Sequence, residues 1–139
     1  MLMFACLLWL GQSDADLILV AHPRVEFRSI TVRELQLIYL KRMDRLQKQR
    51  VVPLQYRHDH PMQKLFERLV MDPHFDLDNY WYEQQVQAGE RPPQAVPDEA
   101  HLLVYVSRNP GHIGFVSAKL LEDARGLGLV IIPFPKPPG

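Results

Sequence analysis

Residues 106–116 read VSRNPGHIGFV, and they contain the end of one element and the beginning of the next. The Asn-Pro-Gly tripeptide at 109–111 cannot continue a helix, so a helix that reaches it ends there. The short apolar run at 113–116 predicts a strand. A helix followed directly by a strand is the repeating unit of α/β domains.

The same alternation extends to both sides of this stretch. Helix starts are expected where the sequence offers an N-cap residue or a first-turn proline, at Thr31 with Glu34, at Pro61, at Asp76 or Asp78, and at Asp98. Strands are expected at 16–21, 51–56, 113–116 and 129–133. The predicted fold class is α/β, with a mixed sheet of about four strands flanked by helices.

Two prolines and a loop qualify this pattern. Pro53 cannot donate to a strand ladder, so the strand at 51–56 is expected to lie at an edge of the sheet or to start irregularly. Residues 89–93 are expected to form a loop that Pro97 closes. In sheets of this class, ligands bind at the carboxyl ends of the strands.

Residues 1–15, MLMFACLLWLGQSDA, resemble a signal peptide in length and hydropathy. The apolar core is shorter than the roughly 20 residues that a membrane-spanning helix needs. Ser13 and Ala15 place small residues at positions −3 and −1 of a cleavage site, but no Lys or Arg precedes the core. The alternatives are a start farther upstream or a buried first element. We expect export to the periplasm, a domain at 16–134 and an extended tail at 135–139.

The composition excludes several classes of protein. The 139 residues hold 16 Lys and Arg and 16 Asp and Glu, so the formal net charge is zero. A nucleic-acid-binding protein needs a broad basic surface, and this balance argues against one. The single cysteine excludes an intrachain disulfide framework and a multi-thiolate zinc site.

The charges are unevenly distributed along the chain. Residues 24–57 carry nine basic and three acidic residues, whereas residues 58–139 carry seven and eleven. The basic stretch at 41–50 is interpreted either as a solvated loop or as a docking patch for an acidic partner or anionic lipid headgroups. The residues of that patch would be Lys41, Arg42, Arg45 and Lys48.

Arg57, His58, Asp59 and His60 lie between a predicted strand and the helix that begins at Pro61. The N–H groups at a helix N-terminus favour an anion, and Arg57 could bind an oxyanion through two hydrogen bonds. The alternative is that His60 or Asp59 caps the helix and Arg57 is a surface residue. Two histidines without a third ligand do not make a metal site, so none is expected.

The sequence contains no nucleophile elbow, P-loop or HExxH motif. His58, Asp59 and His60 could form an acid–base group, but no nucleophile accompanies them. We therefore expect no catalytic residue and no cofactor, and a binding function rather than an enzymatic one.

Six segments occur in a fixed order: ITVRELQLIYLK at 30–41, VVPL at 51–54, Phe66, NYW at 79–81, RPPQAV at 91–96 and VSRNPGHIGFV at 106–116. Together they resemble the phosphate-binding solute receptors of bacterial ABC transporters, and more closely the short single-lobe relatives of these receptors. The first segment is similar to the family pattern LxxELxxIFLGK and the last to VxxxPGxIGYV. The resemblance covers roughly residues 17–116 and implies a periplasmic-binding-protein type II-like fold, mainly one lobe of a full receptor.

The same resemblance implies a phosphate-like anion at Arg57, with departures. Phosphate-binding members carry Ser-Gly-Thr after the arginine, where this chain has His58, Asp59 and His60. The first hypothesis is therefore a secreted solute-binding-like domain that binds an oxyanion weakly. The second is a protein-interaction module of the cell envelope that has lost the ligand. A full receptor encloses its ligand between two lobes, so tight capture here would require self-association or another protein.

Overall fold

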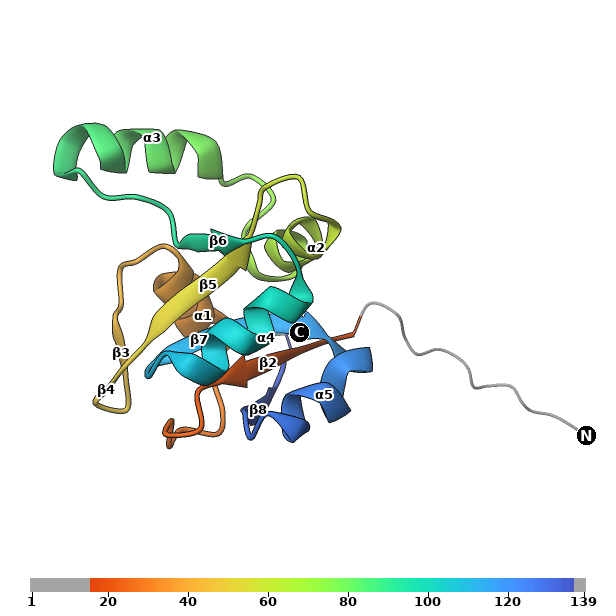
Figure 1. The fold of residues 1–139 in the computed structure, drawn as a ribbon. Coiled ribbons are helices and arrows are strands. Elements are labelled where there is room, and N and C mark those ends of the chain that lie inside the picture. Colours follow the sequence, from red (N-terminus) through yellow and green to blue (C-terminus); the bar gives the residue numbers. More distant parts are fainter. Residues whose placement is uncertain (1–15, 137–139) are drawn as a thin grey trace, which may run out of the picture.

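The computed structural model describes residues 16–136, so the predicted signal peptide at 1–15 and residues 137–139 of the predicted tail lie outside the described part. The strands of the main sheet are β2 (Leu17–Ala21), β5 (Val52–Tyr56), β6 (Gln94–Val96), β7 (His112–Ser117) and β8 (Val130–Pro133). They form one five-stranded sheet in the order β6-β5-β7-β2-β8 (Figure 1). β2 is antiparallel to β7 and β8, whereas β5 is parallel to β6 and β7. The α/β prediction is confirmed, with five strands in this sheet rather than about four.

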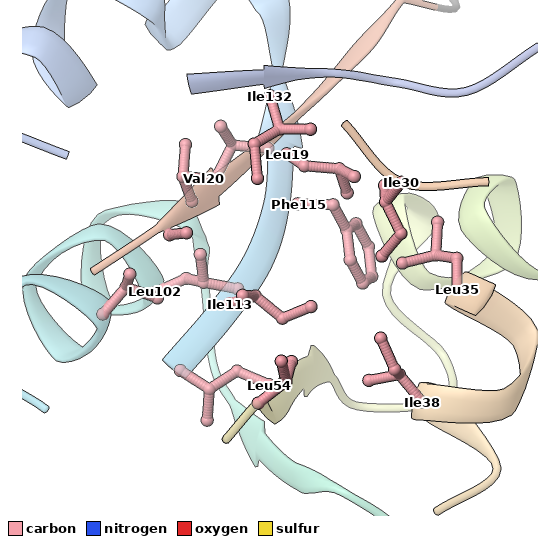
Figure 2. Close-up of a cluster of buried hydrophobic side chains, with 14 of the residues drawn as sticks. Leu19, Val20, Ile30, Leu35, Ile38, Leu54, Leu102, Ile113, Phe115 and Ile132 are labelled. Carbon is pink, nitrogen blue, oxygen red and sulfur yellow. The ribbon is translucent and has the colours of Figure 1, made fainter. Parts of the chain in front are cut away.

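The helices of the described part are α1 (Val32–Tyr39), α2 (Pro61–Val70), α3 (Leu77–Ala88), α4 (Glu99–Arg108), the 3-10 helix η2 (Ala118–Leu120) and α5 (Leu121–Gly126). α1 and α2 cover one face of the sheet, since Tyr39 and Phe66 pack on Phe115 of β7. α4 covers the opposite face, where Leu102 lies against Gly114. Figure 2 shows this arrangement, with Leu102 and Phe115 on opposite sides of the β7 ribbon. No helix within residues 16–136 is both long and apolar enough to cross a membrane.

The predicted helix starts are confirmed. Thr31 Oγ1 accepts the N–H of Glu34 at 3.0 Å, and Glu34 Oε1 accepts the N–H of Thr31 at 2.9 Å. Pro61 is the first residue of α2, while Asp76 and Asp98 are the N-caps of α3 and α4. These caps satisfy N–H groups that a helix leaves without an internal partner, which is why short polar residues fix the helix boundaries.

The expectation of an edge position for the strand that carries Pro53 is wrong, because β5 lies between β6 and β7. Val52 donates its N–H to the carbonyl of Gly111 at 2.8 Å, on the β7 side. Successive backbone groups of a strand point in opposite directions, so the nitrogen of Pro53 faces the β6 side. Pairing with β6 begins only at Leu54, opposite Gln94. The missing N–H of Pro53 therefore interrupts no ladder.

The basic stretch after α1 forms a hairpin rather than a loop. β3 (Arg45–Leu46) pairs antiparallel with β4 (Gln49–Arg50). The two residues between them, Gln47 and Lys48, have φ of 50° and 72°. Positive φ at both central residues is what a two-residue type I′ turn requires, usually with Asn or Gly in those places. The sequence lacks this signal, and it likewise does not predict β6 or α5.

His22 follows β2, and its side chain is only 8% exposed. Its Nδ1 accepts the N–H of Arg24 at 3.1 Å, which requires a ring nitrogen without a proton. Burial lowers the pKa of His22 from its ordinary value of 6.5, and the positive charges of Arg24 and His112 lower it further.

This shift predicts a dependence of stability on pH. The unfolded chain takes up the His22 proton at a higher pH than the folded chain, so the free energy of unfolding is full above about pH 6.5 and falls as the pH drops below it. Urea unfolding between about pH 5 and pH 7 measures the slope. His22→Asn keeps an acceptor for the N–H of Arg24 and should reduce that slope. An equal slope in both proteins would contradict the assignment.

Candidate functional site

The turn from Arg57 to His60 lies at the carboxyl end of β5. The N–H of His60 donates to the carbonyl of Arg57 at 2.9 Å, which closes the turn. The side chains of Arg57, His58 and Asp59 are exposed, and they make no hydrogen bond or ion pair with any other residue in 16–136. The turn therefore offers solvent a guanidinium, an imidazole and a carboxylate close together in sequence.

His60 behaves as the capping alternative predicts. Its Nδ1 accepts the N–H of Met62 at 3.0 Å, which makes it the N-cap of α2. Its ring also stacks on Tyr56, with centroids 4.6 Å apart and planes at 20°. Pro61 has no N–H, and the N–H of Met62 is bound by His60. The first backbone N–H of α2 that has no acceptor within residues 16–136 is therefore that of Gln63. The helix N-terminus thus keeps fewer free donors than its position suggests.

Gln63 fastens this N-terminus to the sheet, and sequence reasoning missed it. The whole residue, backbone included, is 2% exposed. Oε1 accepts the N–H of Tyr56 at 3.0 Å, and Nε2 donates to Glu67 Oε2 at 2.9 Å. The spacing of Gln63 from the buried Phe66 is one helical turn, which was the available signal that it faces inward. Because the buried amide is hydrogen-bonded at both ends, the turn above it has a fixed position.

The neighbouring strand ends are occupied by carboxylates of the chain itself. Glu99 Oε2 accepts the N–H of Ser117 at 2.7 Å, at the end of β7. Asp98 accepts the N–H of His101 at 2.9 Å, and hydrogen bonds from the His101 backbone and ring lower the pKa of that carboxyl. Burial raises the pKa of Tyr56, and the nearby charge of Glu99 raises it further. An anion brought to this edge of the sheet meets Arg57 and several negative charges.

The predicted docking patch precedes β5 in the chain, so it lies toward the end of the strand opposite the Arg57 turn. Lys41 pairs with Glu90, with Nζ and Oε1 3.3 Å apart. Arg42 donates from Nε to the Tyr80 hydroxyl at 3.2 Å, and its guanidinium lies 5.2 Å from the centre of the Tyr80 ring. The hairpin that follows leads into β5, whereas the Arg57 turn follows β5, so the strand separates the two candidate sites.

Lys48 lies in the turn of this hairpin, and Arg45 is the first residue of β3, opposite Arg50. Arg45 Nη1 donates to the carbonyl of Lys48 at 3.2 Å, and both side chains are exposed. The predicted patch therefore has two parts. Lys41 and Arg42 contact Glu90 and Tyr80, whereas Arg45 and Lys48 face solvent.

Among residues 16–136, the turn belongs neither to a metal-ligand cluster nor to the groove between β6 and α4. Within residues 16–136, no group of three or more His, Cys, Asp and Glu side chains is placed to hold a metal ion. A groove of about 600 Å³ runs between β6 and α4, and its lining includes Pro97, Val104 and Tyr105 but no residue of the turn. The turn is therefore an open surface site, which suits a small hydrated ion better than an enclosed ligand.

Comparisons with known proteins place the fold. No model of a known protein family matches the chain, and no curated protein matches its sequence. Three solved structures share the fold, each at 14% identity: PstS from Borrelia burgdorferi (TM-score 0.69), an ABC-type phosphate transport receptor from Vibrio cholerae (0.61), and a phosphate ABC transporter substrate-binding protein with bound phosphate from Clostridium perfringens (0.61).

The alignments cover 89%, 84% and 85% of this chain but 49%, 45% and 43% of the three receptors. The chain therefore spans about half the length of the receptors it matches. The periplasmic-binding-protein type II-like fold is confirmed.

Proposed function

We propose that the chain is a non-catalytic solute-binding-like lobe, exported to the periplasm, whose Arg57–His60 turn binds an inorganic oxyanion of the phosphate type weakly. The observation that carries the proposal is the exposed guanidinium of Arg57, which has no partner within residues 16–136 and follows β5 directly before the N-terminus of α2. An arginine and a backbone N–H are the donors that phosphate prefers in proteins. Phosphate-binding receptors with this fold support the choice of ligand.

The expected affinity is low for three physical reasons. One lobe leaves the anion in water, where each charged contact is weak. The N–H groups of Met62 and Ser117 are already bound by His60 and Glu99. The carboxylate of Asp59 lies in the same turn and repels a dianion. We expect a dissociation constant in the millimolar range, equivalent to about −4 kcal/mol.

Isothermal titration with phosphate near neutral pH tests this site. Arg57→Ala should weaken binding at least about tenfold, because a hydrogen bond to a charged group contributes about 1.5–3 kcal/mol. Arg68→Ala is the matched control, since Arg68 is also exposed but lies at the other end of α2. Binding that survives Arg57→Ala, or no heat with wild-type protein at millimolar phosphate, would sink the proposal.

Asp59→Asn is the complementary variant. The substitution removes the negative charge of the turn and breaks no contact within residues 16–136, so stability should not change. Phosphate should then bind several-fold more tightly. Removing a charge repulsion of about 1 kcal/mol lowers the dissociation constant about fivefold. Unchanged or weaker binding would place the ion away from this turn.

A second candidate function is that of a protein-interaction module in the cell envelope, and the basic hairpin favours it. Since Lys41 and Arg42 contact Glu90 and Tyr80, reversing them would also disturb α3. Arg45→Glu with Lys48→Glu is the cleaner variant, because both side chains are exposed. Loss of partner recovery in a pull-down from an envelope extract would support the module, and undiminished recovery would exclude the hairpin as its surface.

A further inference from the structure

α3 extends away from the sheet and exposes apolar side chains (Figure 1). Tyr82 is 68% exposed and Val86 is 67% exposed, and they lie one helical turn apart on the same face. Phe75, just before the helix, is also exposed. Of the five large hydrophobic residues that are exposed in the described part, these three come from this one segment. Clustering of this kind marks an interaction surface rather than scattered surface hydrophobics.

The same segment is acidic throughout. Residues 72–90 contain five Asp and Glu and no Lys or Arg. Asp78 and Glu83 are exposed on α3, beside Tyr82. A partner for this helix must therefore offer both positive charge and apolar surface.

The residues that connect α1 to the basic hairpin contact α3 and the residue that follows its C-cap. Tyr80 donates its hydroxyl hydrogen to the carbonyl of Leu40 at 2.8 Å, and Lys41 pairs with Glu90 at 3.3 Å. In Figure 1, α3 and the β3–β4 hairpin both lie at the left of the molecule, with the hairpin below the helix. The exposed basic residues there are Arg45, Lys48 and Arg50. One side of the molecule thus consists of an acidic, apolar half and a basic half.

The backbone in the basic half is held in an unfavourable conformation. Within residues 16–136, the non-glycine residues with positive φ are Lys41, which follows the C-cap of α1, and Gln47 and Lys48 in the turn of the hairpin. At Gln47 and Lys48 these conformations are the ones that a two-residue type I′ turn requires. The hairpin therefore presents its cations in a defined geometry, unlike a flexible charged loop.

We propose that two copies of this chain associate about a two-fold axis, with the acidic α3 of each copy docked on the basic hairpin of the other. A two-fold interface brings the same surface of both subunits together, so every contact occurs twice. A surface with one acidic and one basic half is complementary to itself under this rotation. Tyr82 and Val86 are then covered at the centre, which is where apolar side chains contribute most to association.

This association goes beyond the oxyanion proposal, because it uses no residue of the Arg57 turn. Its test is sedimentation velocity of the purified chain at low and high salt. We expect a dimer with a dissociation constant in the micromolar range at about 50 mM salt, weakened about tenfold or more at about 500 mM.

Two charge-reversed variants make the test specific. Arg45→Glu with Lys48→Glu reverses two of the three cations of the hairpin and makes it acidic like α3, and Asp78→Lys with Glu83→Lys reverses both charged residues of α3 and makes it basic like the hairpin. Each variant alone should remain monomeric, because identical charges then face each other. An equimolar mixture should form a heterodimer, since every contact between the two variants is again between opposite charges. Lys119→Glu with Lys136→Glu, which alters exposed lysines of η2 and the C-terminal segment, is the control and should dimerise normally.

Three results would overturn the proposal. The first is a wild-type chain that stays monomeric at about 200 μM in low salt, well above a micromolar dissociation constant. The second is a mixture of the two reversed variants that stays monomeric. The third is a monomer that binds vesicles containing phosphatidylglycerol through Arg45 and Lys48, which would assign the hairpin to a lipid surface instead. Phosphate binding at Arg57 could succeed or fail independently of all three.

Discussion

Phe115→Ala is expected to lower the free energy of unfolding by about 3–5 kcal/mol, the range for a fully buried phenylalanine. Phe115 is 0% exposed and joins elements from distant parts of the chain. Its ring stacks on Phe66 with centroids 4.0 Å apart, and it meets the rings of Tyr39 and Tyr56 edge-on at 5.9 Å and 5.2 Å. Truncation leaves a cavity that α1, α2 and β5 all line.

Urea unfolding followed by circular dichroism measures this loss. Phe115→Leu is the matched control, because it keeps most of the volume and should cost clearly less than Ala. If alanine cost under about 1.5 kcal/mol, the site would be able to collapse, and the aromatic cluster would not be the centre of the core.

Gly114→Val is expected to cost about 3 kcal/mol, through overpacking on the other face of the same strand. A Cβ at this position would lie 2.7 Å from Leu102 Cδ2 and 2.8 Å from Leu102 Cδ1. Leu102 is 0% exposed, so its side chain has no free space into which it could move. α4 would have to shift away from the sheet, taking the cap Asp98 and the Glu99–Ser117 contact with it.

A double-mutant cycle with Leu102→Ala tests this cause. The alanine removes the atoms that clash, so the double variant should be more stable than the sum of the two single losses by about 1 kcal/mol or more. Additive losses would show that Gly114 is required for another reason, such as backbone conformation.

Capping residues and prolines predicted where the helices begin. The order in which the strands pair could not be predicted from the sequence. Thr31, Pro61 and Asp98 fix helix starts through bonds to residues a few positions away, so their pattern is visible in the sequence. Pro53 illustrates the limit, because its effect depends on which neighbour its nitrogen faces, and that follows from the order of the strands. β6 lies among prolines and buries only Val96, which leaves no periodic signal to detect.

In the candidate site, too, contacts between residues close in sequence could be predicted and contacts between distant residues could not. The capping role of His60 was one of two interpretations open from the sequence, and its bond to Met62 spans two residues. The bond from Ser117 to Glu99 spans 18 residues and exists because β7 lies beside the helix that follows β6. Sequence reasoning therefore located the Arg57 turn but could not show how much of the surrounding edge the chain's own carboxylates occupy.

The central claim is that this lobe retains a weak oxyanion site at the Arg57 turn. The most direct test is a phosphate titration of ¹⁵N-labelled protein, with amide resonances observed one by one. The account predicts saturable shifts with a millimolar dissociation constant, centred on residues 57–60, and their loss in Arg57→Ala. Shifts that stay linear up to about 50 mM phosphate, or that saturate at another part of the surface, would contradict it.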